Sequence, residues 1–196
     1  QLQKYCDEMS ELNADLVVLA GDIFDENTPL DDMVDASKAL STIKNKLGIY
    51  YVYGNHDNGS RNFDDVAFGP EEIKENLEKN GITVLEDEVI TLDKVNIIGR
   101  KDASFWGNNP RLATSELLAM IPEDKRNNYT IILDHQPLDL DENAALGIDL
   151  QLSGHTHGGQ LFPMGIVQSL TSDTLIRGQR TIHDFTAITS SGMAGW

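Results

Sequence analysis

The chain has 196 residues, of which 40% are hydrophobic and 24% charged, as is ordinary for a globular domain of substantial size. Its 32 acidic and 15 basic residues give a formal net charge of −17, which argues against an extended nucleic-acid interface because such interfaces need Lys and Arg to neutralise phosphates. A single cysteine excludes an internal disulfide and a thiolate metal site.

Hydrophobic periodicity predicts strands and helices that alternate along the chain. In the first half we expect a helix over residues 2–12, a strand over 15–20, a helix over 30–47, a strand over 49–53, a loop over 58–69 and a helix over 70–80. In the second half we expect strands over 82–85, 88–92 and 95–99, a helix over 112–121, a strand over 129–133, a short helix over 141–146 and strands over 148–152 and 181–188. With no repeat or linker in view, this alternation predicts one α/β domain over residues 1–196.

Four of the expected strands end in short polar motifs. The motifs are Gly21-Asp22, Gly54-Asn55-His56-Asp57, Asp134-His135 and Gly154-His155-Thr156-His157. They contain four of the five histidines, and ligands of α/β sheets bind beyond the carboxyl ends of the strands. The four motifs are therefore expected to meet at one edge of the fold.

The residue types in these motifs suit a metal site. The candidate ligands are Asp22, Asn55, His135, His155 and His157. Mixed nitrogen and oxygen ligands fit Mn, Fe or Zn better than calcium. Any one motif alone is commonly a polar turn. Their combination at four strand ends favours the metal site.

The order of the motifs resembles the calcineurin-like metallophosphoesterase superfamily over residues 15–157. The longer string over residues 154–163 and the closing residues 191–196 resemble its bacterial YkuE-type branch, which includes membrane-associated phosphoesterases. The resemblance implies a four-layer α/β/β/α sandwich of two mixed sheets flanked by helices. It also implies hydrolysis of a phosphate monoester or diester by a hydroxide that bridges two metal ions.

The resemblance assigns roles to the candidate residues. Asp22 would bridge the two metals, and His157 would bind the first. The second metal would be completed by Asn55, His135 and His155.

Beyond the metals, four residues are candidates for contact with substrate. The resemblance implies that His56 faces the phosphate and that Asp57 orients His56. Arg61 and Arg100 fall in expected loops and could clamp a phosphate, with solvated surface as the alternative.

One feature departs from the superfamily pattern. The Asp-X-His motif that opens the pattern, and supplies two ligands to the first metal, does not precede Gly21. We therefore expect a domain truncated at both ends, with an incomplete first-metal site and a missing N-terminal segment that could associate with a membrane. We expect a bacterial protein whose substrate is a phosphorylated small molecule or a lipid-linked phosphate, not a nucleic acid. A non-catalytic metal-binding scaffold and a nuclease of the same superfamily are the alternatives.

Overall fold

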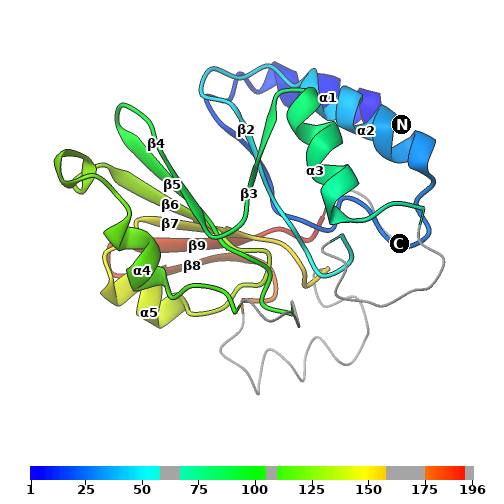
Figure 1. The fold of residues 1–196 in the computed structure, drawn as a ribbon. Helices are drawn as coiled ribbons and strands as arrows, with labels where there is room; N and C mark the ends of the chain where they lie inside the picture. Colours follow the sequence, from blue (N-terminus) through cyan, green and yellow to red (C-terminus); the bar gives the residue numbers. More distant parts are fainter. Residues whose placement is uncertain (58–66, 105–109, 158–174, 193–196) are drawn as a thin grey trace.

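The structure, a computed structural model, describes residues 1–57, 67–104, 110–157 and 175–192. Two sheets face each other within this part of the chain (Figure 1). The smaller sheet has the order β1-β2-β3, with β1 at Val17–Leu19, β2 at Ile49–Val52 and β3 at Ile82–Leu85. Both of its pairings are parallel. The carboxyl ends of β1 and β2 therefore lie at the same edge, and that edge carries the first two polar motifs.

The larger sheet is mixed and has the order β4-β5-β6-β7-β9-β8. Its strands are β4 Glu88–Thr91, β5 Val95–Gly99, β6 Tyr129–Leu133, β7 Leu150–Ser153, β8 Gly178–Ile182 and β9 Phe185–Thr189. The central pairings are parallel, whereas the outer pairings β4–β5 and β8–β9 are antiparallel. The single strand expected over residues 181–188 is wrong, because His183 turns the chain with a φ of 52° and divides it into a hairpin.

Helices cover the outer faces of both sheets (Figure 1). The smaller sheet is covered by α1 Leu2–Glu11, α2 Leu30–Ser41 and α3 Pro70–Lys79, and the larger by α4 Thr114–Ala119 and α5 Leu140–Ala145, with a short 3-10 turn at Glu123–Lys125. Helix α2 ends well before the predicted residue 47. The chain after it turns toward the residues just before β1, where the N–H groups of Lys46 and Leu47 donate to the carbonyl of Asp15.

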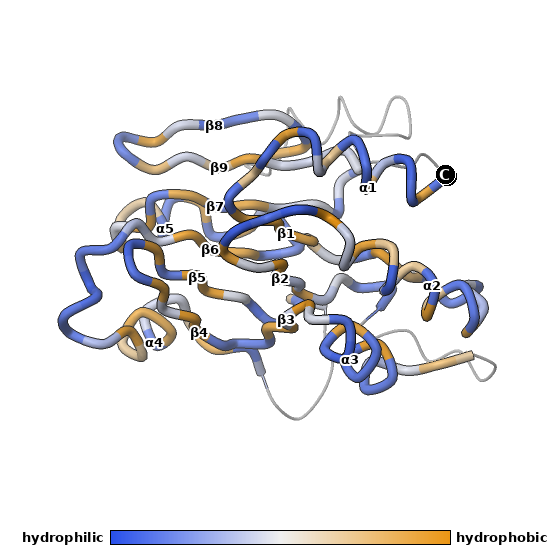
Figure 2. Tube along the Cα trace, turned by 90° about the horizontal axis from the view of Figure 1, so that it is seen from above, coloured by the Kyte–Doolittle hydropathy of each residue, from blue (hydrophilic) through white to orange (hydrophobic). Residues whose placement is uncertain are grey.

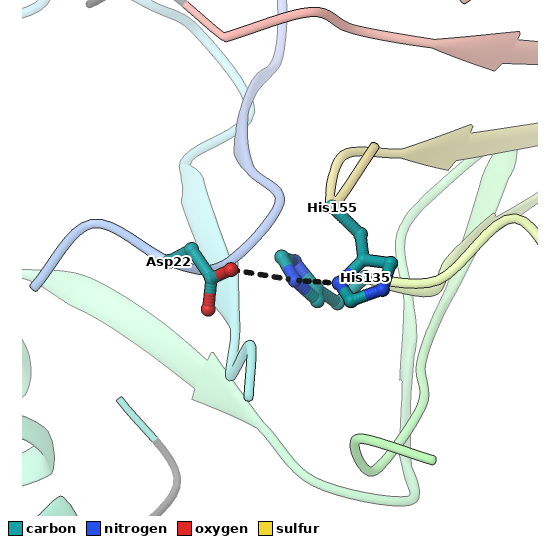
Figure 3. Close-up of side chains that lie close together, drawn as sticks. All are labelled: Asp22, His135 and His155. Carbon is teal, nitrogen blue, oxygen red and sulfur yellow. Dashed lines mark hydrogen bonds and ion pairs between the residues drawn. The ribbon is translucent and has the colours of Figure 1, made fainter. Parts of the chain in front are cut away.

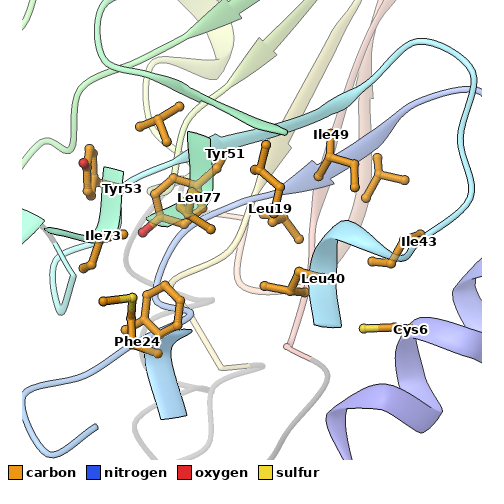
Figure 4. Packing of buried hydrophobic residues seen from close by; sticks show 14 residues of the cluster. Cys6, Leu19, Phe24, Leu40, Ile43, Ile49, Tyr51, Tyr53, Ile73 and Leu77 are labelled. Carbon is orange, nitrogen blue, oxygen red and sulfur yellow. The ribbon is translucent and has the colours of Figure 1, made fainter. Parts of the chain in front are cut away.

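Side chains of the strands alternate between two hydrophobic layers. Tyr50 and Val52 of β2 point between the sheets, where they pack against Ile97 and Leu133 of the larger sheet. The intervening Tyr51 points outward and joins the cluster beneath the helices, together with residues of α2 and α3 (Figure 4). Figure 2 shows hydrophobic residues concentrated along the strands in the middle of the molecule. The alternation confirms the four-layer arrangement, because each sheet is buried on both faces.

Among the residues that the structure describes, no helix combines the length and the apolarity that crossing a bilayer requires.

Candidate metal centre

Three of the five predicted ligands converge where the two sheets meet (Figure 3). Asp22 follows β1, His135 follows β6 and His155 follows β7, and one ligand atom of each lies within 4.8 Å of the others. Nε2 of His135 lies 3.0 Å from Oδ2 of Asp22 and 3.2 Å from Nδ1 of His155. One carboxylate oxygen and two imidazole nitrogens thus face a common point, and this donor set suits a borderline divalent cation such as Zn²⁺, Mn²⁺ or Fe²⁺.

The orientation of His135 is fixed from the opposite sheet. Its Nδ1 lies 2.6 Å from the carbonyl oxygen of Ala20. Because a carbonyl can only accept, Nδ1 carries a hydrogen and Nε2 is the atom turned toward Asp22 and His155. Burial lowers the pKa of His135, but the hydrogen bond and charge of Asp22 outweigh burial and raise it to about 9. Without a metal, a proton on Nε2 therefore holds the place that a cation would take.

Asp22 and His155 are in the protonation states that metal binding needs. Burial raises the pKa of Asp22. The hydrogen bond and charge of His135 lower the pKa by more than burial raises it, so the net shift is downward and the carboxylate form is favoured. Burial and the charge of His135 both lower the pKa of His155, which favours the neutral imidazole. Neither group has to lose a proton at neutral pH to bind a metal.

The backbone is strained at three of the predicted ligands. Asp22, His155 and His157 have φ angles of 52°, 68° and 45°, in the left-handed region that side chains other than glycine seldom adopt. Such strain persists only where the surrounding structure imposes it, and it gathers at functional sites. Its presence at these three residues supports the placement of the site at this edge.

Two glycines allow the loops after β1 and β2 to approach. A Cβ atom on Gly21 would lie 2.5 Å from the nitrogen of Gly54 and 2.7 Å from Nδ1 of His135. A Cβ atom on Gly54 would collide with Oδ1 of Asp22. The close approach places Oδ1 of Asp22 where it accepts the N–H of His56 at 2.9 Å.

The structure gives Asp57 a different role from the predicted one. The fully buried carboxylate accepts the N–H of Asp22 at 2.8 Å, the N–H of Gly54 at 3.1 Å and the hydroxyl of Tyr51. Burial and the neighbouring Asp22 raise the pKa of Asp57 to about 7. Asp57 therefore holds the backbone of the two ligand loops together, which corrects the expectation that it orients His56.

One partner of His56 is Glu26, a residue that the sequence does not single out. Nδ1 of His56 lies 2.9 Å from Oε2 of Glu26, and both side chains are largely buried. Glu26 stands four positions after Asp22 in the same loop, so an acidic residue at this spacing is the only available sequence signal. The contact itself depends on the fold, because 30 residues separate the two side chains.

The remaining predicted ligands lie on the same loops. Asn55 is buried, 8% exposed, in the turn after β2, beside the peptide that binds Asp22. His157 is half-buried in the loop after β7 and lies outside the group of three ligand atoms within 4.8 Å. Metal binding by these two residues stays a prediction.

The structure contradicts the predicted phosphate clamp at Arg100. The guanidinium is 3% exposed and donates to Oγ1 of Thr114 at 2.9 Å, to Asp139 at 3.1 Å and to the carbonyl of Leu112 at 2.8 Å. It is thus engaged between helices α4 and α5, behind the larger sheet. Arg61, the other candidate, lies outside the described residues.

Comparison with known proteins gives a consistent assignment. The sequence profile described as calcineurin-like phosphoesterase matches residues 1–159. The chain is 27% identical over 191 residues to an uncharacterized metallophosphoesterase of Helicobacter pylori, covering 97% of this chain and 48% of the relative. It is 29% identical to YkoQ of Bacillus subtilis, an uncharacterized metallophosphoesterase, covering 91% of this chain and 65% of that protein.

It is also 29% identical to the uncharacterized metallophosphoesterase YkuE of Bacillus subtilis, covering 78% of this chain and 50% of that protein. The chain thus spans about half to two thirds of the length of these relatives. The profile match takes in all four polar motifs in the predicted order, and the chain therefore belongs to the calcineurin-like phosphoesterase family.

Proposed function

We propose that the protein hydrolyses a phosphate ester at a pair of metal ions bound at the edge where its two sheets meet. Membership of the family supports metal-dependent phosphoester hydrolysis in general. The observation that carries the proposal is the convergence of Asp22, His135 and His155 within 4.8 Å from three different strand ends. The ligands in this proposal are Asp22, Asn55, His135, His155 and His157.

The residues present fit such metals. Asp22 is half-buried, His135 is buried and His155 is exposed, and one oxygen and two nitrogens from these residues form a mixed donor set for Mn, Fe or Zn. When bound, metals supply a Lewis acid for the phosphoryl oxygens and lower the pKa of water. The protein's part is to hold the ligands in position: Ala20 orients His135, and the peptide of His56 orients Asp22.

His56 is the proposed catalytic residue next to the metals. Its Nδ1–H donates to Glu26, which fixes the ring plane and makes Nε2 the atom that transfers a proton to the departing oxygen. Glu26 is thus a positioning residue for His56, the role that the sequence analysis gave to Asp57.

The substrate class in this proposal is a phosphorylated small molecule or a lipid-linked phosphate. The net charge of −17 disfavours a polyanionic nucleic acid, whose phosphates would meet few cationic side chains. A single phosphate is compatible with an acidic protein because bound metals reverse the local field.

The test is hydrolysis of an aryl phosphate monoester and an aryl phosphate diester by protein loaded with Mn, Fe or Zn. We expect Asp22→Asn and His155→Ala to abolish turnover and His183→Ala, an exposed histidine in the β8–β9 turn, to leave it unchanged. Turnover by a rigorously metal-free preparation would overturn the proposal. Metal binding without hydrolysis of either ester would identify a metal-binding scaffold instead.

A further inference from the structure

A polar network, buried except at the exposed Asp139 and the partly buried Arg111, lies behind the two histidine loops of the larger sheet, between the strands and helices α4 and α5. We propose that this network is a positioning device that fixes His135 and His155 relative to each other, an inference that rests on the proposed metal centre. Its members are Arg100, Arg111, Thr114, Asp134, Asp139, Asn143, Gln151 and Ser153.

The first part of the network holds the residue next to His135. Asp134 is fully buried, and Arg111 binds it in a bidentate pair with distances of 3.2 Å from Nη1 and 2.8 Å from Nη2. A fork of this kind fixes direction as well as distance, because the planar guanidinium matches the carboxylate. The position of Asp134 thereby sets the peptide from which the His135 side chain extends.

A second carboxylate joins both arginines. Oδ2 of Asp139, just before α5, accepts Nη2 of Arg111 at 3.0 Å and Nη1 of Arg100 at 3.1 Å. Asp139 has a φ of 57°, so the chain is strained at the point where it serves both partners. The network therefore extends from the His135 loop to the helices.

The network then returns to the His155 loop. Arg100 donates to Oγ1 of Thr114 at 2.9 Å, and this hydroxyl donates to Asn143 at 2.9 Å. Asn143 donates to Gln151 at 2.8 Å, and Gln151 donates to Oγ of Ser153 at 3.3 Å. Ser153 ends β7, immediately before the loop that carries His155.

The two loops are also joined directly, because the N–H of Gly154 donates to the carbonyl of His135 at 2.9 Å. The side-chain network and this main-chain bond therefore connect the loop of His135 to the loop of His155 by two separate routes. Hydrogen-bond networks in a low-dielectric interior fix the geometry of their members, whereas apolar side chains of the same volume would give comparable stability without that fixed geometry. Precise placement of ligands is what such a network adds to a fold that its hydrophobic layers already stabilise.

A matched pair of variants tests the inference. Thr114 and Thr130 are both buried, and each hydroxyl accepts one hydrogen bond from a side chain. Thr130 lies at the amino end of β6, where its hydroxyl accepts from the Asn96 amide and donates to the main-chain carbonyl of Asn128. Each Thr→Val change keeps the shape and removes the hydroxyl. For both variants we expect the unfolding midpoint to fall by about 2–4 °C.

Metal affinity and the spectrum of bound metal separate the two positions. We expect Thr114→Val to weaken Co²⁺ binding about tenfold and to alter the visible absorption of bound Co²⁺, whereas Thr130→Val leaves both as in the wild type. Arg111→Lys, which keeps the charge and loses the fork, should reproduce the effect of Thr114→Val.

If the wild type binds Co²⁺ and neither Thr114→Val nor Arg111→Lys changes that binding, the positioning role of the network is overturned, but the proposed metal centre is not. A wild-type protein that binds neither Co²⁺ nor Zn²⁺ would overturn the proposed metal centre and this inference with it.

Discussion

The two sheets support their parts of the proposed metal centre in different ways. The smaller sheet holds Asp22 through the main chain: one buried carboxylate, Asp57, accepts the N–H groups of Asp22 and Gly54. The larger sheet holds its histidines through a chain of side chains that runs behind the strands. In the smaller sheet, the free energy that stabilises the ligand loops comes largely from one carboxylate. In the larger sheet, it is shared among many side chains of the network. Loss of Asp57 should therefore have a larger effect than loss of any one network hydroxyl.

His135 is the residue at which both kinds of support meet, so its loss should have the largest effect. Its Nδ1 binds Ala20 of the smaller sheet, and its Nε2 faces Asp22. We expect His135→Ala to reduce kcat/KM by about a thousandfold or more, because a metal that stabilises transition-state charge contributes several kcal/mol. Steady-state hydrolysis of an aryl phosphate measures the change. A loss of less than tenfold would show that the two sheets do not share a metal centre through this residue.

Asp57→Asn tests the main-chain support directly. The amide oxygen of asparagine can still accept a hydrogen bond. Its NH2 group, however, would face main-chain N–H groups that donate to the carboxylate in the wild type, and a buried donor would be left without an acceptor. We expect a loss of about 10–100-fold in zinc affinity together with a lower unfolding midpoint.

Asp149→Asn is the matched control for Asp57→Asn, because Asp149 also accepts a main-chain N–H, from Thr130 at 2.7 Å, but at the opposite edge of the larger sheet. It should lower the unfolding midpoint without changing zinc affinity. If the two variants lower zinc affinity equally, Asp57 has no specific role in supporting the metal ligands.

Glu26→Gln tests whether the smaller sheet also positions a catalytic side chain. The amide can still accept from Nδ1 of His56, but the hydrogen bond to a neutral amide is weaker than one to a carboxylate and holds the ring less firmly. We expect kcat to fall about tenfold with KM and metal content unchanged. A change in metal content with kcat preserved would instead place Glu26 among the groups that support the metals.

The contrast between the sheets also explains what the sequence could predict. Asp22 and His155 were identifiable because apolar runs mark the strands and the polar motifs follow them directly, so that their meeting at one edge depends only on the strand order. The partners of His56 and Arg100 were not identifiable, because each contact joins segments that only the fold brings together. Asp57 is one residue from His56 in the sequence, yet it turns toward the backbone of Asp22, 35 residues away.

The same limit applies to the element boundaries. The chain after α2 is periodic enough to continue as a helix, but the carbonyl of Asp15 captures the N–H groups of Lys46 and Leu47. Likewise, the turn at His183 depends on a left-handed backbone conformation, and no glycine stands at this position to indicate it in the sequence. Competition between local periodicity and tertiary hydrogen bonds decided the first case.

The smallest expected effect is a proton released on metal binding, and it sharpens the comparison because it reports on the contact between the sheets. The pKa of His135 is raised to about 9, so the metal-free protein carries a proton on Nε2 up to about that pH. The other groups that face it are Asp57, whose pKa is about 7, and Asp22 and His155, whose lowered pKa values leave them without a proton to release.

At about pH 8, therefore, a metal that takes the place of the His135 proton should release about one proton, and the number should fall toward zero as the pH rises past about 9. The apparent affinity should rise over the same range and then level off. Calorimetric titration of zinc in two buffers of different ionisation enthalpy counts the protons, and His135→Ala should remove the release. Binding without proton release at about pH 8 would mean that the metal does not replace the proton between His135 and Asp22, and that the two sheets are joined there by an ion pair alone.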